Sequence, residues 1–410
     1  MKLKTLDSLD INGKTILYRA PYDIELQEVN GIFELSDDSR IAATLPTLQY
    51  LLKQNCKIVI LTYVGRPDGA VVEGLRTTPH AKRLSALLNH PVLKVDDCIG
   101  KEVDLEVAHM KPGDIIMLEN VRFHSEETID DNEFAKKLCV GKDLVVFDAF
   151  PQAHRIHAST TGIQRILPTV AGRYLEHEVK MLSLLLEKPQ HPFTVIVGGA
   201  KISDKVDAIR NLLNVADTFL VGGAVANIFL KAQGRIIGSS FIEDVFVDKM
   251  KREKKDWIQD AGEILKQAET LGKKIITPVD LVISDGVTVK TIDITTEEIP
   301  MGWMAFDIGR KTLEEFSLVI SQSKTVFMNG PMGKFENERF SFGSQVIINA
   351  MKNLKANFLG ETIVAGGETI DVVRKYGSLD DYSHVSLAGG ATLEFLAGRE
   401  LPALTPLLLK

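Results

Sequence analysis

Short apolar runs alternate with longer amphipathic segments along the whole chain. In the first half, four runs rich in Val, Ile and Leu show little alternation between apolar and polar positions, which is typical of strands covered on both faces. These predicted strands are residues 15–18, 57–62, 114–118 and 143–147. Apolar residues at helical spacing predict helices between them, over residues 40–54, 78–88 and 132–138. Strands separated by helix-length connections predict βαβ units and a mainly parallel sheet.

A long helical pattern over residues 171–187 is followed by a second series of strands. The helix is expected to end before Pro189. Six further strands are predicted at residues 194–197, 218–221, 274–277, 325–328, 362–365 and 384–387, with helical patterns such as 201–213 and 256–271 between them. The predicted fold class is therefore α/β, with two doubly wound, Rossmann-like parallel-sheet halves joined by a helix.

Length and composition are consistent with this two-part organisation. The chain has 410 residues, 45% of them hydrophobic and 25% charged. At about 150 residues per domain, this length allows two or three domains. The composition excludes a disordered, fibrous or collagen-like protein. The formal net charge of −7 argues against a nucleic-acid or anionic-membrane partner.

The cysteines and the N-terminus indicate a reducing compartment. Cys56, Cys98 and Cys139 form no C-x-x-C pair. We therefore interpret them as small buried hydrophobes, and neither a disulfide framework nor a structural zinc cluster is expected. No apolar segment follows Met1 as in a signal peptide, and no run reaches the roughly 18–20 residues of a membrane helix. We expect a soluble, cytoplasmic protein.

Arginine recurs where the strands of the first half end. Arg19, Arg66, Arg122 and Arg155 follow predicted strands, and Arg40 begins the first predicted helix. In open parallel sheets, ligands bind outside the carboxyl ends of the strands. A group of guanidinium ions at this edge predicts a site for phosphate or carboxylate. The alternative is that each arginine is a solvated surface charge.

In the second half, glycine takes the place of arginine at the strand ends. The corners are Gly198-Gly199-Ala200-Lys201, Gly222-Gly223-Ala224, Asn329-Gly330-Pro331, Gly366-Gly367-Glu368-Thr369 and Ala388-Gly389-Gly390-Ala391. Glycine lets backbone N–H groups approach a ligand, and a helix N-terminus attracts anions. We therefore predict a nucleotide-phosphate site, with Lys201 and Lys205 on one face of the first following helix. The alternative is that close helix–strand packing alone requires these glycines. The chain has neither a Walker motif nor a G-x-G-x-x-G dinucleotide motif.

Several longer motifs resemble those of one enzyme family. They are Glu119-Asn120-Val121-Arg122-Phe123-His124, Ala153-His154-Arg155, His157-Ala158-Ser159, Gly198-Gly199-Ala200-Lys201-Ile202-Ser203-Asp204-Lys205, Pro278-Val279-Asp280, Gly302-Trp303-Met304, Asn329-Gly330-Pro331-Met332-Gly333 and Phe335-Glu336. In this order they resemble the phosphoglycerate kinases over nearly the full chain, from Leu6 to Leu401.

The resemblance implies two α/β domains that face each other across a cleft. Residues 1–170 would bind 3-phosphoglycerate, 171–188 would form the interdomain helix, 189–390 would bind MgATP or MgADP, and 391–410 would return to the N-terminal domain. The implied reaction is reversible phosphoryl transfer between 1,3-bisphosphoglycerate and ADP. The implied cofactor is Mg²⁺, with ATP or ADP as substrate, and the implied state is a monomer that binds no nucleic acid and no membrane.

The resemblance also assigns roles to individual positions. The implied catalytic residues are Arg40, Lys201, Gly367 and Gly390, and the implied substrate-binding residues are Asp23, Arg40, Tyr63, Arg66, Arg122 and Arg155. The implied nucleotide-binding residues are Gly199, Lys201, Lys205, Gly223, Asn329, Pro331, Glu336, Gly366, Gly367, Glu368 and Thr369, with Glu368 also at the metal.

The chain departs from the family pattern mainly on the substrate side. Pro21 and Asp23 replace a substrate-contacting Asp and an Asn, and Tyr63 replaces a His. Pro21 offers no hydrogen bond to a substrate hydroxyl, and a second carboxylate at about 4 Å would repel an acidic substrate by about 1–4 kcal/mol. Glu368 replaces an Asp but still supplies a carboxylate. Three hypotheses stay open: a divergent phosphoglycerate kinase, a relative with another carboxylate acceptor, and a nucleotide-binding protein without turnover.

Overall fold

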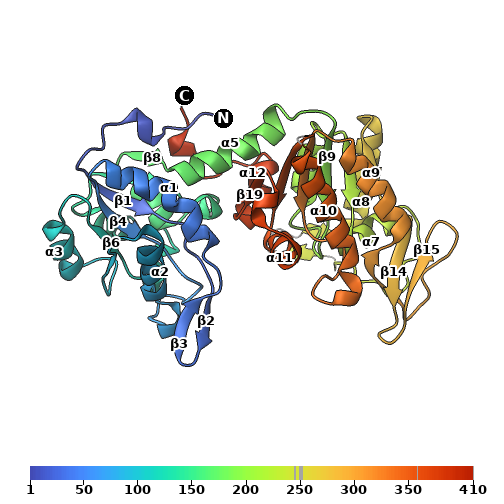
Figure 1. Cartoon of the computed structure of the whole chain (residues 1–410), viewed down its shortest axis with the longest axis horizontal. Helices are drawn as coiled ribbons and strands as arrows, with labels where there is room; N and C mark the ends of the chain where they lie inside the picture. The colour runs from blue at the N-terminus through green and yellow to red at the C-terminus, as the bar shows by residue number, and fades with distance from the viewer. Residues whose placement is uncertain (244–245, 249–252, 358, 410) are drawn as a thin grey trace. The chain divides into compact units, whose positions relative to one another are not determined.

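The chain forms two compact units. The computed structural model describes residues 1–243, 246–248, 253–357 and 359–409 (Figure 1). The first unit comprises Met1–Lys180 with Glu400–Lys410, and the second comprises Met181–Arg399. The division falls inside helix α5 (Arg173–Glu187), the helix expected over 171–187. Helix α12 (Gly389–Leu396) belongs to the second unit, so the segment that belongs to the first unit begins later than residue 391.

The first unit contains a six-stranded parallel sheet in the order β5-β6-β4-β1-β7-β8. Its strands are β1 (Thr15–Arg19), β4 (Lys57–Leu61), β5 (Leu93–Lys94), β6 (Ile115–Met117), β7 (Leu144–Phe147) and β8 (Thr169–Ala171). The four predicted strands are confirmed. Strands β5 and β8 were not predicted, because two or three residues are too few to produce a hydrophobic pattern.

Four α-helices and one hairpin join this sheet in the first unit, besides short 3-10 and π segments and the beginning of α5. They are α1 (Ser39–Lys53), α2 (Thr78–Leu88), α3 (Lys101–His109), α4 (Asn132–Cys139), and the antiparallel pair β2 (Leu26–Val29) and β3 (Ile32–Leu35). The three predicted helices are confirmed, whereas α3 and the hairpin are additional. Capping explains where α4 begins, because the Asp131 side chain accepts a hydrogen bond from the Phe134 amide.

The ends of the chain pair within the first unit. Leu3 forms an antiparallel bridge with Leu408. The Ala403 amide donates to the Ala153 carbonyl at 3.0 Å. The Gln164 side chain donates to the Ala403 carbonyl at 2.9 Å. The last residues of the chain are therefore fixed by backbone hydrogen bonds to the first unit.

The second unit has its own six-stranded parallel sheet, in the order β13-β10-β9-β17-β18-β19. Its strands are β9 (Phe193–Val197), β10 (Thr218–Val221), β13 (Lys274–Ile276), β17 (Thr325–Asn329), β18 (Glu361–Ala365) and β19 (His384–Ser386). All six predicted strands are confirmed, and with them the α/β class with two parallel sheets. No helix within the described ranges combines the length and the hydrophobicity needed to cross a bilayer.

The helices of the second unit connect these strands, and a smaller antiparallel sheet is added to them. The helices are α6 (Val206–Leu212), α7 (Gly223–Ala232), α8 (Trp257–Thr270), α9 (Arg310–Ser321), α10 (Phe342–Ala356), α11 (Gly367–Tyr376) and α12. The antiparallel strands are β14 (Asp280–Ser284), β15 (Val289–Asp293) and β16 (Met304–Ile308), with a separate pair, β11 (Phe246–Asp248) and β12 (Glu253–Lys255). None of these five antiparallel strands was predicted.

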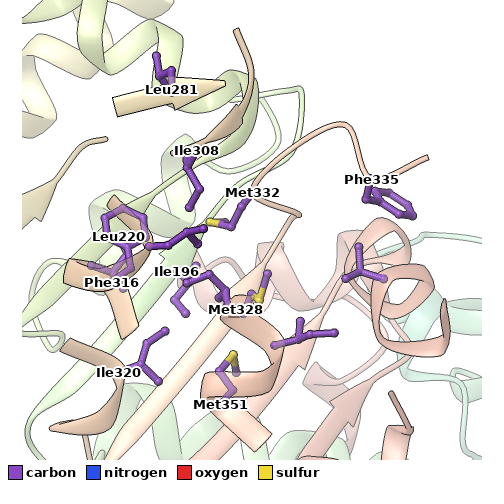
Figure 2. Packing of buried hydrophobic residues seen from close by; sticks show 14 of the residues in the cluster. Ile196, Leu220, Leu281, Ile308, Phe316, Ile320, Met328, Met332, Phe335 and Met351 are labelled. Atoms are coloured by element: carbon purple, nitrogen blue, oxygen red, sulfur yellow. The ribbon is translucent and has the colours of Figure 1, made fainter. Parts of the chain in front are cut away.

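A continuous hydrophobic core supports the strand ends of the second unit. Figure 2 shows Ile196 from β9, Leu220 from β10 and Met328 from β17 in one cluster of buried side chains. Met332, just beyond the end of β17, belongs to the same cluster and is fully buried. Interiors of this kind are close-packed, so the loops that follow these strands are held at fixed positions.

Candidate functional site

The arginine at the end of β1 faces inward and is not available at the surface. Arg19 is fully buried. Its Nε donates to both the carbonyl and the hydroxyl oxygen of Ser159 at 3.1 Å, and its Nη1 donates to the Ala20 carbonyl. Arg19 therefore stabilises the strand end on which the other arginines are arranged.

Arg122 has the geometry of a ligand-binding arginine. Its guanidinium lies 3.6 Å from the centre of the Tyr63 ring, and its Nη1 donates to the Gly65 carbonyl at 2.7 Å. The side chain is buried, yet within the described part of the chain its Nε has no hydrogen-bond partner. A buried donor left unpaired is costly, so this Nε is a candidate donor to a bound anion.

Asp23 and Arg40 lie beside this arginine. The Asp23 carboxylate accepts the Gly65 amide at 3.0 Å, and the Asp23 carbonyl accepts from Arg40 Nη1. Through Gly65, the structure links Asp23, Arg40, Tyr63 and Arg122 into one group, which we call the arginine cluster. Arg40 is thus bonded to the main chain of Asp23, and the Asp23 carboxylate itself accepts a backbone amide.

The remaining predicted substrate residues are connected to the arginine cluster less directly. Arg66 follows Gly65 and is exposed. Arg155 is half-buried, and its Nε has no hydrogen-bond partner among the described residues. Burial, and then the charges of Arg155 and His157, lower the pKa of His154 to about 4, so this histidine is neutral at pH 7. Arginines therefore provide the positive charge at this edge.

Glu127 is the acid that balances the charge beneath the arginines. Burial alone would raise its pKa, but the His157 ring, whose Nδ1 lies 3.6 Å from Oε1, and the hydrogen bonds from Ser159 outweigh burial and hold its pKa below the usual range. Its Oε1 accepts from the Ser159 hydroxyl at 2.6 Å, and Oε2 accepts the Ser159 amide at 2.8 Å. Ser159 also binds Arg19, so the acid, the serine and the arginine form one buried network.

In the second unit, the glycine corners surround a polar cavity of about 490 Å³. Its walls come from the loops after β9, β17 and β18 and from the start of α12. The predicted residues that line this polar cavity are Lys201, Lys205, Asn329, Gly366, Gly367, Glu368, Thr369 and Gly390. The structure thus brings together residues that lie up to 189 positions apart, from Lys201 to Gly390.

An apolar cavity of about 400 Å³ adjoins the polar one. Its apolar walls are formed by Phe241, Leu281, Met304, Phe306, Ile308 and Met332. Four other predicted residues line it: Gly199, Gly223, Pro331 and Glu336. Ala200 and Glu368 line both cavities, so the two are contiguous. An apolar space beside a polar one suits a nucleoside joined to phosphates.

The two lysines are not on a helix, which corrects the sequence prediction. Helix α6 begins at Val206, and Lys205 is its N-cap. Both lysines lie in the loop before it, where Lys205 Nζ donates to the Lys201 carbonyl at 3.3 Å. Lys205 is buried, which lowers its pKa, and the charge of Glu368 opposes this shift. Lys201 is exposed in the wall of the polar cavity.

Packing explains some of the corner glycines, and open space surrounds others. A Cβ on Gly198 would lie 2.1 Å from the Pro331 carbonyl oxygen, so close packing of two loops requires glycine there. A Cβ on Gly367 or Gly390 would meet no described atom within 4 Å, because both face the polar cavity. Close packing therefore explains Gly198, whereas approach of a ligand to the backbone explains Gly367 and Gly390.

Asn329 and Thr369 connect the ends of two neighbouring strands. The Asn329 side chain donates to the Ala365 carbonyl at 3.0 Å, and the Thr369 hydroxyl accepts the Gly330 amide at 2.7 Å. These bonds hold the loop after β17 against the loop after β18. The shape of the polar cavity depends on both side chains.

Comparison with known proteins identifies the family. The family model described as phosphoglycerate kinase matches residues 6–399. The chain belongs to the phosphoglycerate kinase family.

Relatives in this family share the full length of the chain. The phosphoglycerate kinase of Moorella thermoacetica is 40% identical over 405 residues, covering 98% of each chain. That of Thermosipho africanus is 41% identical over 408 residues, covering 98% of this chain and 97% of the relative. The solved phosphoglycerate kinase structure from Coxiella burnetii has a TM-score of 0.83 at 33% identity, covering 99% of this chain and 98% of that one. The chain is therefore a phosphotransferase with a carboxyl group as acceptor, as its relatives are.

One titratable group beside these cavities was not predicted from the sequence. Asp307 in β16 lines the apolar cavity. Burial raises the pKa of its carboxyl to about 7, although the Gly343 and Ile308 amides donate to it and oppose the shift. The only sequence signal is a single acid in the apolar run Ala305-Phe306-Asp307-Ile308.

Proposed function

We propose that this chain transfers a phosphoryl group reversibly between the 1-carboxyl group of 1,3-bisphosphoglycerate and ADP, giving 3-phosphoglycerate and ATP. The observation that carries the proposal is the contiguous pair of cavities in the second unit. An apolar space that opens into a polar one with two lysines fits a nucleoside and its phosphates in that order. Family membership supplies the reaction.

The arginine cluster is the proposed site for the phosphoglycerate. Arg40 would contact the transferring phosphoryl group, while Asp23, Tyr63, Arg66, Arg122 and Arg155 would position the rest of the substrate. The unpaired Nε atoms of Arg122 and Arg155 support this assignment, since each is a donor for an anionic oxygen. The stacking of Arg122 on Tyr63 fixes the plane of the guanidinium before substrate binds.

The proposed nucleotide site divides between the two cavities. The phosphates would lie at Lys201, Lys205, Gly366, Gly367, Thr369 and Gly390, and the nucleoside at Gly199, Gly223, Pro331 and Glu336, with Asn329 in the wall of the polar cavity beside it. The helices α11 and α12 begin at Gly367 and Gly389, in the wall of the polar cavity. Their N-terminal amides favour negative charge there.

Glu368 is the proposed ligand of Mg²⁺. Its carboxylate is a hard oxygen donor of the kind that Mg²⁺ prefers, it lines both cavities, and its Oε2 would lie 3.0 Å from a Cβ on Gly199. The residues present therefore fit the ion. When bound, Mg²⁺ would neutralise phosphate charge.

The chemistry requires positioning and charge stabilisation and no general base. A carboxylate oxygen of 3-phosphoglycerate attacks the γ-phosphorus of ATP; the new O–P bond forms as the bond to the β-phosphate oxygen breaks, and ADP leaves. The reverse reaction exchanges these roles. Lys201, Lys205 and Arg40 would stabilise the charge on the transferring group. The reaction needs both substrates in contact and water excluded, because water also accepts a phosphoryl group.

The cellular setting is part of the proposal. We expect a monomer that acts in the cytoplasm without a nucleic-acid or membrane partner. The net charge of −7 supports the absence of polyanionic partners.

One assay tests the function against its two alternatives. The chain is incubated with MgATP and 3-phosphoglycerate, acyl phosphate is trapped as a hydroxamate, and ADP is followed. We expect hydroxamate and ADP in equal amounts with this substrate. Hydroxamate only with other carboxylates would indicate a changed acceptor, for which Pro21 and Tyr63 would be the cause. ATP binding in calorimetry without turnover on any carboxylate would indicate a binding protein, and either result overturns the proposal.

A further inference from the structure

A group of three potential metal ligands lies in the first unit. Asp97 and Cys98 follow strand β5, and His124 follows strand β6. One ligand atom from each, a carboxylate oxygen, the sulfur and a ring nitrogen, lie within 4.8 Å of one another. The proposed phosphoryl transfer gives these three side chains no role.

The three ligand types are those that zinc prefers. Thiolate, imidazole and carboxylate bind Zn²⁺ at about 2.0–2.3 Å, so tetrahedral coordination places ligand atoms about 3.3–3.8 Å apart. Asp97 Oδ1 and His124 Nε2 are 2.7 Å apart, within hydrogen-bond distance. On binding an ion, this pair would separate and the Cys98 sulfur, which lies within 4.8 Å of both atoms, would join the same centre. The set is too soft for Mg²⁺, which favours oxygen ligands alone.

The backbone around the three side chains is already fixed. The Cys98 amide donates to Asp97 Oδ1 at 2.6 Å. The Asp97 carbonyl accepts the Glu119 amide at 3.2 Å, and the Val121 carbonyl accepts the His124 amide at 3.2 Å. The His124 ring also packs against Phe134, with ring centres 5.2 Å apart. The cost of ordering the ligands is therefore small, as in a preformed site.

Solvent access also suits a bound cation. The side chain of Asp97 is 52% exposed and that of His124 is 27% exposed, which gives an ion a path from solvent and leaves a position for water. Cys98 is buried and lies on the inner side of the site. Metal binding would release the thiol proton, as for other cysteine ligands.

We propose that Asp97, Cys98 and His124 bind one divalent transition-metal ion of the Zn²⁺ class, with water as the fourth ligand. The site would be separate from the Mg²⁺ site at Glu368. His124 lies two residues after Arg122. An ion bound to His124 would therefore hold the end of the segment that carries this arginine.

The test measures metal binding directly. The full chain, without an affinity tag or nucleotide, is freed of metal with a chelator and titrated with Zn²⁺ by calorimetry and with Co²⁺ by absorbance. We expect one ion per chain and, with Co²⁺, the near-ultraviolet charge-transfer band of a thiolate–metal bond. Cys98→Ser and His124→Gln should each weaken Zn²⁺ binding by at least about 10- to 100-fold.

Matched variants distinguish this site from other cysteines, histidines and the Mg²⁺ ligand. Cys56→Ser alters another buried cysteine, His109→Gln alters another first-unit histidine, and Glu368→Gln alters the proposed Mg²⁺ ligand; all three should bind Zn²⁺ as the unaltered chain does. Absence of the Co²⁺ charge-transfer band, or unchanged Zn²⁺ affinity in Cys98→Ser, would overturn the proposal. If Cys98→Ser does not fold, His124→Gln decides alone, since this partly exposed side chain can be replaced without opening the core, and full affinity in that variant also overturns the proposal.

Discussion

The two proposed anion sites, one in each unit, are built by different means. In the arginine cluster, long side chains supply the charge, and backbone carbonyls such as that of Gly65 hold them in place. In the polar cavity, glycine corners and the N-termini of α11 and α12 form much of the wall, together with Lys201 and Lys205. A site made of side chains can change by substitution while the fold persists. At a corner such as Gly198, which also packs two loops together, a substitution disturbs the fold as well. This agrees with where the chain departs most from its family, at Pro21, Asp23 and Tyr63.

The largest expected effect is the loss of activity when Lys201 is removed from the polar cavity. Lys201→Ala should lower kcat by about 100- to 1,000-fold, because it removes a cation from the developing phosphoryl charge. The side chain is exposed, so circular dichroism and the melting temperature should not change. Lys231→Ala removes another exposed lysine of the same unit and should keep full activity. If the Lys201→Ala variant keeps the kcat of the unaltered chain, this lysine is not needed to stabilise the charge on the transferring phosphoryl group.

Two glycine variants separate packing from ligand approach. Gly198→Ala should destabilise the fold by about 1–3 kcal/mol, since its Cβ would meet the Pro331 and Gly330 carbonyl oxygens at 2.1 and 2.7 Å. Gly390→Ala should change the free energy of unfolding by less than about 0.5 kcal/mol but weaken ADP binding, because its methyl group enters the polar cavity. Denaturant unfolding and ADP calorimetry on both variants measure these effects. Full ADP affinity in Gly390→Ala would remove this residue from the site.

The titration of Asp307 tests the apolar cavity. Its pKa of about 7 in the fold exceeds the ordinary value of 3.8, so the folded state binds this proton more tightly than the unfolded state does. Stability from this group is therefore greatest in acid and falls as the pH rises towards 7. Between about pH 5.5 and pH 7 the loss should be about 1–2 kcal/mol.

Thermal unfolding across this pH range is the measurement for Asp307. The Asp307→Asn variant cannot ionise at this position, so its melting temperature should fall less with rising pH than that of the unaltered chain. Parallel curves for the two proteins would show that the carboxyl titrates in its ordinary range.

The smallest expected effect concerns the arginine cluster. Tyr63→Leu removes the ring on which Arg122 stacks and should raise KM for 3-phosphoglycerate by roughly fivefold, equivalent to about 1 kcal/mol. Tyr63→Phe keeps the ring and should retain the original KM. Steady-state kinetics at saturating MgATP measure both. A KM that changes equally in the two variants would assign the effect to the hydroxyl group and contradict the stacking argument.

Much of the sheet architecture could be predicted because its central strands are apolar along their whole length. Strands β1 and β9 are buried at every position, which produces continuous hydrophobic runs. Strand β15 is mostly exposed, so it gives no such signal. The start of α6 was also misplaced: the apolar spacing continues through residues 201–205, but these residues form the loop that lines the polar cavity.

The sequence by itself determined the two α/β halves, the order of the parallel strands along the chain, and the family. These follow from local periodicity and from motifs whose order is written in the chain. The tertiary structure decided which partners hold each arginine. Arg122 stacks on Tyr63 and binds the carbonyl of Gly65, 57 positions away, whereas Arg19 is held by Ser159, 140 positions away. It also decided the pKa of Asp307, because burial depends on packing between distant segments rather than on neighbours in sequence.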